Sequence, residues 1–429
     1  MNCGATLATS CVNNWSAPAT SSRIQSVKSA AKLLVDILMS DDLNDKDQVK
    51  IALVPFEGQV NVASAGVSVT SPPSWIDWSD QAGAKWNGAN FNQHDFGGFI
   101  GAKTVGHGWL FANLTDNFPT VKWAGCVEMR AGAYELTDDA PNTALPDSLF
   151  VPFFHPDEPD STATTSGATR YNNRSNGTSS GTNYTFTNNY LNDVAAFTTP
   201  AVAQKSLDRY TTVTPAFWTG RMDVEGLLTP YEYGPNKGCP RPIYPLANAD
   251  SKTAIKAEID AMIAYWSTGT FIPTGLVWGW HALSPEEPYT EGTKPADEHY
   301  EKTVKAIVLF TDGENDITDD GNPNRSRYHG YSYVTTNVGG TYRLASTATG
   351  AETALNTKTA TLCSNVRAAE IRLYVVTFGT MSSASTTLMQ NCATVDEGKR
   401  LYYNAPTTAD LESIFEEIAR DLTNVHISR

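Results

Sequence analysis

The sequence predicts an α/β protein built on a doubly wound, mostly parallel sheet. Its apolar runs are continuous rather than alternating, as in VKIALVPF (49–56), VKAIVLF (304–310) and IRLYVVTFG (371–379). Such runs are typical of strands buried on both faces, in sheets that carry helices on each side. Segments with helical periodicity separate these runs, and a 41% hydrophobic content over 429 residues is enough for a sizeable core. The length alone indicates two or three domains, at about 150 residues each.

The first predicted element is a helix over residues 21–39. Ser21 or Ser22 can cap it, and apolar residues recur at helical spacing at Ile24, Val27, Ala31, Leu34, Val35 and Leu38. An acidic turn, SDDLNDKD, leads from this helix into the strand at 49–56. Residues 1–56 therefore read as the start of the α/β domain.

The middle of the chain, residues 57–248, lacks this alternation of helices and strands. It is rich in Trp, Gly, Pro and Asn and shows no long helical period, and its low-complexity segment from about 160 to 190 predicts a mobile loop. A structureless connection of this length does not suit a compact domain. We therefore expect a large folded insertion that is irregular and partly β.

The α/β pattern resumes in residues 249–429. A helix is predicted over 251–266, with Ile255, Ile259, Met262 and Ile263 on one face. The segments that follow are a loop and helix at 268–285, the strand at 304–310, a helix around 353–369, the strand at 371–379, a short strand at 401–405 and a closing helix at 409–425.

Charge and hydropathy exclude several classes of partner. The chain has 46 acidic and 31 basic residues, a net charge of −15, which disfavours binding to nucleic acid or anionic lipid. It has no run of about 18 apolar residues of the kind that spans a bilayer. The first twenty residues lack the basic and apolar regions of a signal peptide, so we find no export signal in this chain.

The six cysteines favour an oxidising compartment, which conflicts with the missing export signal. No CxxC pair is present, which argues against a zinc ribbon or a thioredoxin-like site. An even number of scattered cysteines favours two or three disulfides in an oxidising compartment, and free buried thiols are the alternative. Local pairing would join Cys363 to Cys392 and Cys3 to Cys11, leaving Cys126 with Cys239, which is one connectivity among fifteen.

One pair of oxygen-bearing side chains is expected at the carboxyl edge of the sheet, where open parallel sheets bind their ligands. Asp312 directly follows the strand at 304–310 and precedes Gly313, although Asp-Gly in this place is also a common turn. Thr270, in the loop GTFIPTGL, could bring a hydroxyl to the same edge. Mg²⁺ prefers such ligands, but one carboxylate and one hydroxyl are too few to hold it firmly.

The insertion offers weaker candidates. Five tryptophans could stack on sugars with help from Asp77, Asp80 and Asp95, or could form the insertion's own core: Trp75, Trp78, Trp86, Trp109 and Trp123. His94, His107 and His155 lack the spacing of metal ligands and read as structural or exposed. The acidic pairs 138–139 and 319–320 read as solvated loop charges, and the loop 314–322 lacks the spacing of an EF-hand.

Several motifs, taken in order, resemble one family. KAIVLFTDGEN, the upstream GTFIPTGLVWGWHALSP and the helix-strand opening resemble the von Willebrand factor A (vWA) domain. WAGCVEMR, LFVPFFHPDEPD, NNYLND and GPNKGCPRPIYPL in the insertion, and LYVVTFG and LMQNCAT near the end, resemble more narrowly the TadG-like proteins of the Tad/Flp pilus-assembly system. The resemblance covers essentially the whole chain.

The resemblance implies a Rossmann-like sheet and a metal-ion-dependent adhesion site (MIDAS). Thr270 and Asp312 match the family's loop Thr and last Asp, whereas its Asp-x-Ser-x-Ser motif is absent. We expect that Met1 belongs to that motif and that the chain lacks the membrane anchor, the first central strand and the principal metal ligands. Mg²⁺ or Mn²⁺ would then bind the full-length protein and bind this chain weakly or not at all. The apolar edges of the strands at 49–56 and 304–310 should then be left exposed, or the gap between them should be filled in another way.

The resemblance also implies a function. It implies a non-catalytic binding protein of pilus biogenesis, adhesion and biofilm formation, which contacts other pilus-assembly or surface proteins. Its place would be the bacterial cell envelope, in the periplasm and anchored to the inner membrane in the full-length form. The alternative is a carbohydrate-binding surface module that binds glycans through the insertion tryptophans. An enzyme is disfavoured because GxSxG, HExxH and a Gly-rich phosphate loop are absent.

Overall fold

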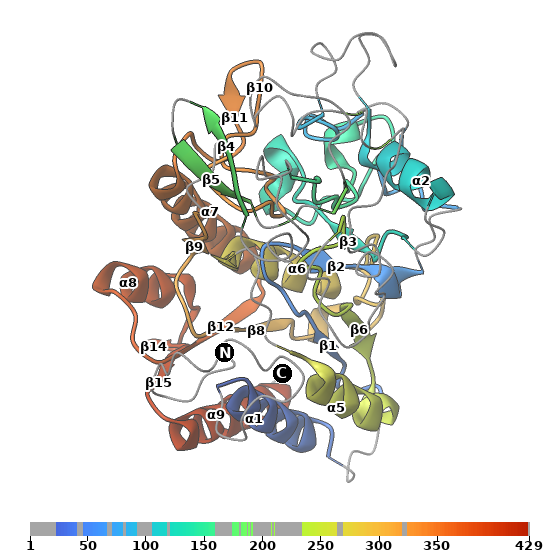
Figure 1. The fold of residues 1–429 in the computed structure, drawn as a ribbon. Coiled ribbons are helices and arrows are strands. Elements are labelled where there is room, and N and C mark those ends of the chain that lie inside the picture. The colour runs from blue at the N-terminus through green and yellow to red at the C-terminus, as the bar shows by residue number, and fades with distance from the viewer. Residues whose placement is uncertain are drawn as a thin grey trace.

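The fold is known here from a computed structural model that describes residues 23–40, 46–66, 71–79, 83–91, 105–117, 121–158, 174–179, 182–186, 188, 190–191, 207, 210, 234–263, 269–319 and 324–427. Within these ranges the chain is a mixed α/β protein with a parallel sheet (Figure 1). The fold class is therefore confirmed as α/β. No helix among the described residues combines the length and apolarity needed to cross a bilayer.

The parallel sheet has three strands in the order β15–β12–β8. They are β8 (Ala306–Thr311), β12 (Arg372–Phe378) and β15 (Tyr402–Ala405), and β12 pairs in parallel with both neighbours. β8 and β12 had been predicted from continuous apolar runs, and β15 had been predicted as a short strand at 401–405. β12 is buried along nearly its whole length, as expected of a strand with two neighbours.

Helices cover both faces of this sheet, so it is doubly wound. On one face, Tyr374 and Val376 of β12 pack against α1 (Arg23–Leu38) and α9 (Thr408–Ile427). On the other face, Leu373 and Val375 join the core formed with α6 (Ile272–Leu283), α7 (Ala348–Ala368) and α8 (Ser383–Cys392). α8 was not predicted, because its polar sequence SASTTLMQNC shows little apolar periodicity.

A second, two-stranded sheet lies beside the first. β1 (Ile51–Leu53) pairs antiparallel with β6 (Tyr244–Ala247), and α5 (Lys252–Ala261) packs against β1. β6 falls inside the range 57–248 that we had assigned to the insertion. The insertion therefore returns to the sheet several residues earlier than predicted, because the half-buried run YPLA is too short to give a clear strand signal.

α6 packs against both sheets, and its contacts show how the strands of one sheet are directed relative to those of the other. A Cβ added to Gly275 would meet the ring of Phe56, just beyond β1, and one added to Gly279 would meet Ile307, near the start of β8. Because α6 begins at the carboxyl edge of β8, Phe56 lies at that same edge. β1 and β8 therefore run in the same direction, and the order of strands across the molecule is β6, β1, a break, β8, β12 and β15.

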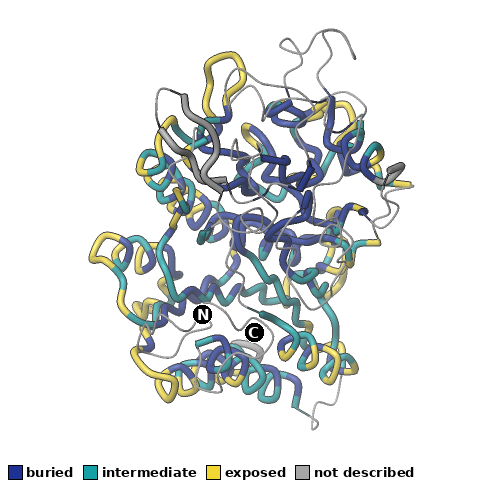
Figure 2. Tube along the Cα trace, in the orientation of Figure 1, coloured by how far each residue is buried: buried dark blue, intermediate teal, exposed yellow. Residues whose placement is uncertain are grey.

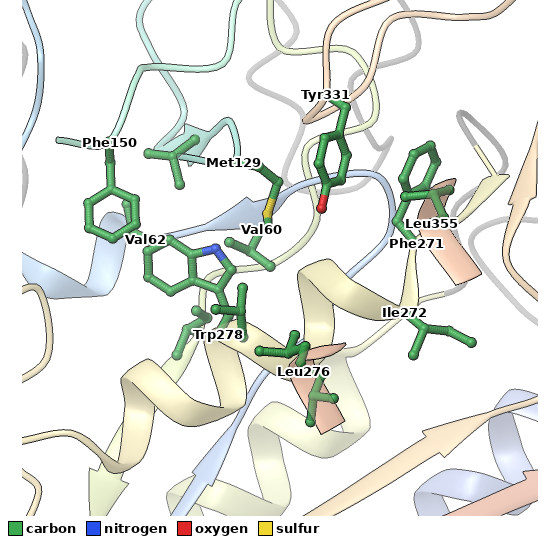
Figure 3. Packing of buried hydrophobic residues seen from close by; sticks show 14 of the residues in the cluster. Val60, Val62, Met129, Phe150, Phe271, Ile272, Leu276, Trp278, Tyr331 and Leu355 are labelled. Carbon is green, nitrogen blue, oxygen red and sulfur yellow. The ribbon is translucent and has the colours of Figure 1, made fainter. Parts of the chain in front are cut away.

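The insertion is not an independent layer. Most of its buried apolar side chains belong to one continuous core with α6, β8 and β12, in which Trp278 contacts Phe150 (Figure 3). Its described elements are short: β2 (Val60–Asn61), α2 (His107–Asn117), β3 (Cys126–Val127) and the hairpin of β4 (Arg174–Ser179) with β5 (Thr182–Phe186). The hairpin departs from the loop that we expected over about 160–190, and α2 was not predicted.

Two disulfides match the expected pairing. Cys126 joins Cys239 within the insertion, and Cys363 on α7 joins Cys392 on α8. Cys3 and Cys11 lie outside the described residues. The first bond connects positions 113 residues apart, so it ties the first half of the insertion to its end.

Candidate functional site

The structure places Thr270 beside the turn that carries Asp312. β7 (Gly269–Thr270) pairs antiparallel with β9 (Asp316–Ile317), which draws the loop before α6 against the loop after β8. A Cβ built on Gly313 would lie 3.6 Å from the Thr270 Oγ1. The two residues that the sequence singled out therefore lie at the same carboxyl edge of the sheet.

Two residues that we did not predict fix this edge. The Thr311 hydroxyl donates to the Gly313 carbonyl at 2.8 Å and accepts from the Gly313 amide at 3.2 Å, which holds the turn after β8. The Asn315 side chain accepts from the Ile272 amide at 2.9 Å, at the start of α6, and donates to Thr359 of α7. The only sequence signal for Asn315 is its place three positions after Asp312. Its hydrogen-bond partners, Ile272 and Thr359, lie far away in the sequence.

Arg23 changes the electrostatics of the edge. Its guanidinium, at the first residue of α1, lies 3.6 Å from an Asp312 carboxylate oxygen and over the ring of Phe378. A cation already beside the carboxylate disfavours a second one, and Mg²⁺ or Mn²⁺ would need several oxygen ligands in octahedral array. Among the described residues, no group of three or more His, Cys, Asp and Glu side chains could hold a metal. The residues present do not fit a complete metal site.

A large cavity opens next to this edge, between β1 and β8. Its volume is about 1140 Å³, and Thr270 and Asp312 line one end of it. α6 forms one wall through Gly275 and Gly279, and α1 and α9 form the opposite wall. The side chains from α1 and α9 are aliphatic or aromatic: Ile24, Val27, Ala31, Leu34, Val35, Leu38, Phe415 and Leu422. We call this cavity the central slot.

The central slot explains an unusual pattern of burial. The segment 51–56, which contains β1, lies between helices in the interior of the trace, yet all of it is only half-buried (Figure 2). β8 alternates between buried and half-buried residues, although β12 beside it is buried on both faces. The strands at 49–56 and 304–310 thus face each other across the slot instead of pairing, in keeping with the exposed edges that we expected.

Charged residues mark the two ends of the slot. Lys50 and Lys305 directly precede the apolar runs of β1 and β8, and Glu57 and Asp312 directly follow them. Burial lowers the pKa of Lys305, and the nearby Asp138 carboxylate partly offsets this effect. Both flanking strands therefore have a basic amino end and an acidic carboxyl end.

The tryptophans of the insertion lie in the core. Trp75, Trp86 and Trp123 are buried. Trp78 and Trp109 are partly buried against the cluster that contains Trp75 and Trp123. Asp77 accepts hydrogen bonds from the Ala84 amide and the Asn87 side chain. Asp80, Asp95 and His94 lie outside the described residues. The described side chains form no exposed aromatic platform for a sugar.

The other acidic candidates differ in their burial. Asp139 and Asp319 are exposed, as expected of solvated loop charges, whereas Asp138 is half-buried and burial raises its pKa. Residue 320 lies outside the described residues.

In the loop 314–322, the Glu314 carboxylate accepts hydrogen bonds from the backbone amide and the hydroxyl of Ser382. The hydrogen bond from the backbone amide lowers the pKa of the Glu314 carboxyl. Asp316 lies in β9. The described part of this loop therefore holds α8 and β7 in place rather than presenting ligands to Ca²⁺.

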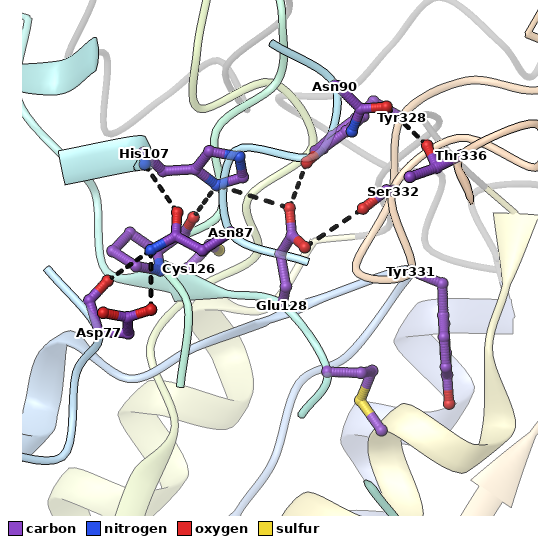
Figure 4. Close-up of polar contacts among 12 residues, drawn as sticks. Asp77, Asn87, Asn90, His107, Cys126, Glu128, Tyr328, Tyr331, Ser332 and Thr336 are labelled. Carbon is purple, nitrogen blue, oxygen red and sulfur yellow. Dashed lines mark hydrogen bonds and ion pairs between the residues drawn. The ribbon is translucent and has the colours of Figure 1, made fainter. Parts of the chain in front are cut away.

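A buried polar network holds the insertion to the rest of the fold. The Arg343 guanidinium donates to the Glu128 carboxylate at 2.5 Å, and both side chains are almost inaccessible to solvent. Tyr328 and Ser332 donate to the same carboxylate, and His107 lies 3.7 Å from it (Figure 4). His107 and His155 are fully buried, which lowers the pKa of each, so both imidazoles are neutral at pH 7. Sequence reasoning missed this network because Glu128 and Arg343 are far apart in the chain.

Comparison with known proteins adds no relative: no family model, no curated protein and no solved structure matches this chain.

Proposed function

We propose that the chain is a non-catalytic binding protein of the vWA type, which serves the Tad/Flp pilus-assembly system by contact with other proteins. Its processes would be pilus biogenesis, adhesion and biofilm formation. The strand order supports this proposal, since β6 runs antiparallel at one edge and β1, β8, β12 and β15 run in one direction. Thr270 and Asp312 lie at the edge where the resemblance to the family expects them.

The central slot is the observation that carries the proposal. Small-molecule sites usually enclose about 300–1,000 Å³, and the slot, at about 1140 Å³, is larger. Its walls are mainly aliphatic, and two strand edges face into it. Large apolar surfaces of this kind mark sites of protein–protein contact.

The two disulfides support a place in the cell envelope, because disulfides persist in oxidising compartments such as the periplasm. No step of the proposed contact passes through a metal. Thr270 and Asp312 could contribute to a Mg²⁺ or Mn²⁺ site only with further oxygen ligands, and Arg23 now lies beside Asp312.

Photo-cross-linking in the host bacterium tests the proposal. A photoreactive amino acid at Leu34, which lines the slot, should cross-link the chain to a pilus-assembly or surface protein that mass spectrometry identifies. The matched control is Leu33, the preceding leucine of α1, which does not line the slot. Deletion of the gene should abolish piliation and attachment to surfaces. Normal piliation after deletion, or equal cross-linking from both positions, would contradict the proposal.

A further inference from the structure

We propose that residues 137–148 of the insertion form a docking loop, which places Leu145 in an apolar, basic-rimmed pocket of a partner protein. We call this segment the Leu145 loop. None of its residues lines the central slot. The inference therefore goes beyond the proposed function, since it concerns a second contact surface.

The tip of the Leu145 loop is apolar and exposed. Leu145 is 47% exposed, although leucine side chains usually lie in the core. Ala140, Ala144 and Pro146 are exposed as well, and Pro141 is half-buried. A single exposed apolar residue is ordinary, whereas a run of them in one short segment marks a site of protein contact.

Hydrogen bonds within the loop fix the shape of this tip. The Asn142 side chain accepts from the Ala144 amide at 2.9 Å, and the Asn142 carbonyl accepts from the Leu145 amide at 2.8 Å. The Ser148 hydroxyl accepts from the Asn142 amide at 2.8 Å and donates to the Leu145 carbonyl at 2.7 Å. The groups bonded inside the loop are not available to water, so the tip presents mainly its apolar side chains.

A buried arginine holds the base of the loop. The Arg130 guanidinium donates to the backbone carbonyls of Thr137, Asp139 and Ser148, and none of these acceptors is a carboxylate. Burial lowers the pKa of Arg130 to about 10, and the nearby Asp139 and Asp138 carboxylates partly offset this effect. Burying a charge in this way costs stability, and it secures the shape of an exposed loop. A loop that is already fixed loses little conformational entropy when it binds.

Charge specifies the chemistry of the partner. Residues 137–147 include Asp138, Asp139 and Asp147 and contain no basic residue. Acidic groups around an apolar contact favour a pocket with Lys or Arg at its rim and disfavour an acidic one. Lys85 lies close by, because its backbone amide donates to the Asp147 carboxylate, so the preference is expected to be moderate.

The same charge argues against two other occupants. A second copy of the chain would bring two net charges of −15 together. An anionic membrane would repel the aspartates of the loop. We therefore assign the surface to a different, basic protein.

Photo-cross-linking in the host bacterium, followed by calorimetry, tests this inference. A photoreactive amino acid at Ala144, which leaves Leu145 in place, should cross-link the chain to one protein that mass spectrometry identifies. That protein is then purified and titrated with the full chain. Capture alone does not support the inference, which also requires that Leu145→Ala weaken binding at least about tenfold, as expected of a side chain that fills a pocket.

The matched control is Val395→Ala. Val395 is 55% exposed and lies in β13 (Val395–Asp396), so its truncation removes a similar side chain from another surface. It should leave the affinity unchanged. Because Leu145 and Val395 are both exposed, both variants should keep the melting temperature within about 1 °C.

Two further variants separate charge from shape. Asp139→Asn keeps the acceptor for the Thr137 hydroxyl, and it should weaken binding about threefold and reduce its dependence on salt. Asn142→Ala removes the acceptor of the Ala144 amide, so it should also weaken binding about threefold. Asn142→Asp, which restores that acceptor, should restore the affinity.

The remaining outcomes overturn the inference. They are the absence of a cross-link from Ala144, a cross-link to a second copy of the chain, and equal effects of Leu145→Ala and Val395→Ala. Binding that does not weaken between about 50 and about 500 mM NaCl would contradict the basic rim. If Leu34 cross-links to a partner while Ala144 does not, the proposed function stands and the docking role of the Leu145 loop is wrong.

Discussion

β12 and β1 are both short apolar strands, yet their surroundings differ. β12 has a strand on each side and helices on both faces, and Leu373, Val375 and Val376 are fully buried. β1 has one partner strand, and all three of its residues remain half-buried because the central slot lies on its other side. The comparison shows that burial of a strand depends on its neighbours as well as on its composition.

The insertion is packed as completely as β12, and more completely than β1. It fills its core with aromatic side chains and pairs its buried charges, whereas the slot leaves apolar side chains and strand edges incompletely covered. We therefore expect the insertion and β12 to be the stable part of the molecule and the two sides of the slot to be the weak part.

The largest expected effect tests the buried network of the insertion. Glu128→Gln leaves the Arg343 guanidinium buried without an ionised partner, so it should lower the free energy of unfolding by about 3 kcal/mol. The matched control is Glu416→Gln, which removes an exposed pair with Arg420 and should cost less than about 0.5 kcal/mol. Denaturant unfolding of both variants measures the difference. An equal loss of stability in both variants would mean that the buried ion pair of the insertion contributes no more than an exposed one.

A matched pair of leucines sharpens the comparison of the two strands. Leu373→Ala in β12 should cost about 3 kcal/mol, because it opens a cavity in a fully packed core. Leu53→Ala in β1 should cost about 1 kcal/mol, because that side chain already borders the slot. The measurement is again denaturant unfolding. An equal loss in both variants would mean that β1 is packed as tightly as β12.

A smaller effect is expected from pH. Burial lowers the pKa of four histidines in the insertion and around it: His107, His155, His281 and His329. The unfolded chain takes up protons below about pH 6.5, while these buried imidazoles stay neutral until the pH falls to their lower folded pKa values. Stability is therefore complete above about pH 6.5 and falls as the pH drops toward those values, by up to about 1.4 kcal/mol per pH unit for each histidine.

Unfolding measured between pH 7 and pH 5 checks this dependence. His281→Phe should reduce its slope by the share of one histidine. The window avoids the titration of Asp36 and Glu314, whose lowered pKa values affect stability only at more acidic pH. A flat profile from pH 7 to pH 5 would show that the four imidazoles are not held neutral in the fold.

The smallest expected effect concerns divalent cations. Thr270 and Asp312 alone should bind Mg²⁺ or Mn²⁺ weakly, so millimolar additions should shift the melting temperature by less than about 1 °C. Calorimetric titration of the same ions gives a direct check. Micromolar affinity would mean that the slot edge has a complete set of ligands, and Asp312→Asn would then have to abolish it.

Much of the fold could be predicted from the sequence because its signals are local. The continuous runs at 304–310 and 371–379 became β8 and β12, and the periodic segments at 21–39 and 409–425 became α1 and α9. β6 and α8 escaped prediction, since YPLA is too short and SASTTLMQNC too polar to show a period. Their positions depend on tertiary contacts that local patterns do not record.

The candidate site was predictable only in part. The turn after β8 identified Asp312, and the loop before α6 identified Thr270. Arg23 and Asn315 could not be assigned, because their partners come from other parts of the chain. The sequence predicted the two exposed strand edges of the slot. It could not predict that α1 and α6 form its opposite walls, because this depends on how the helices are arranged in space.

Hydrogen exchange of the backbone amides tests the central claim, that a strand is missing between β1 and β8, most directly. Amides on the slot side of both strands should exchange at least about a hundredfold faster than those of β12, because local opening there requires little loss of packing. Protection of β1 and β8 equal to that of β12 would contradict the account.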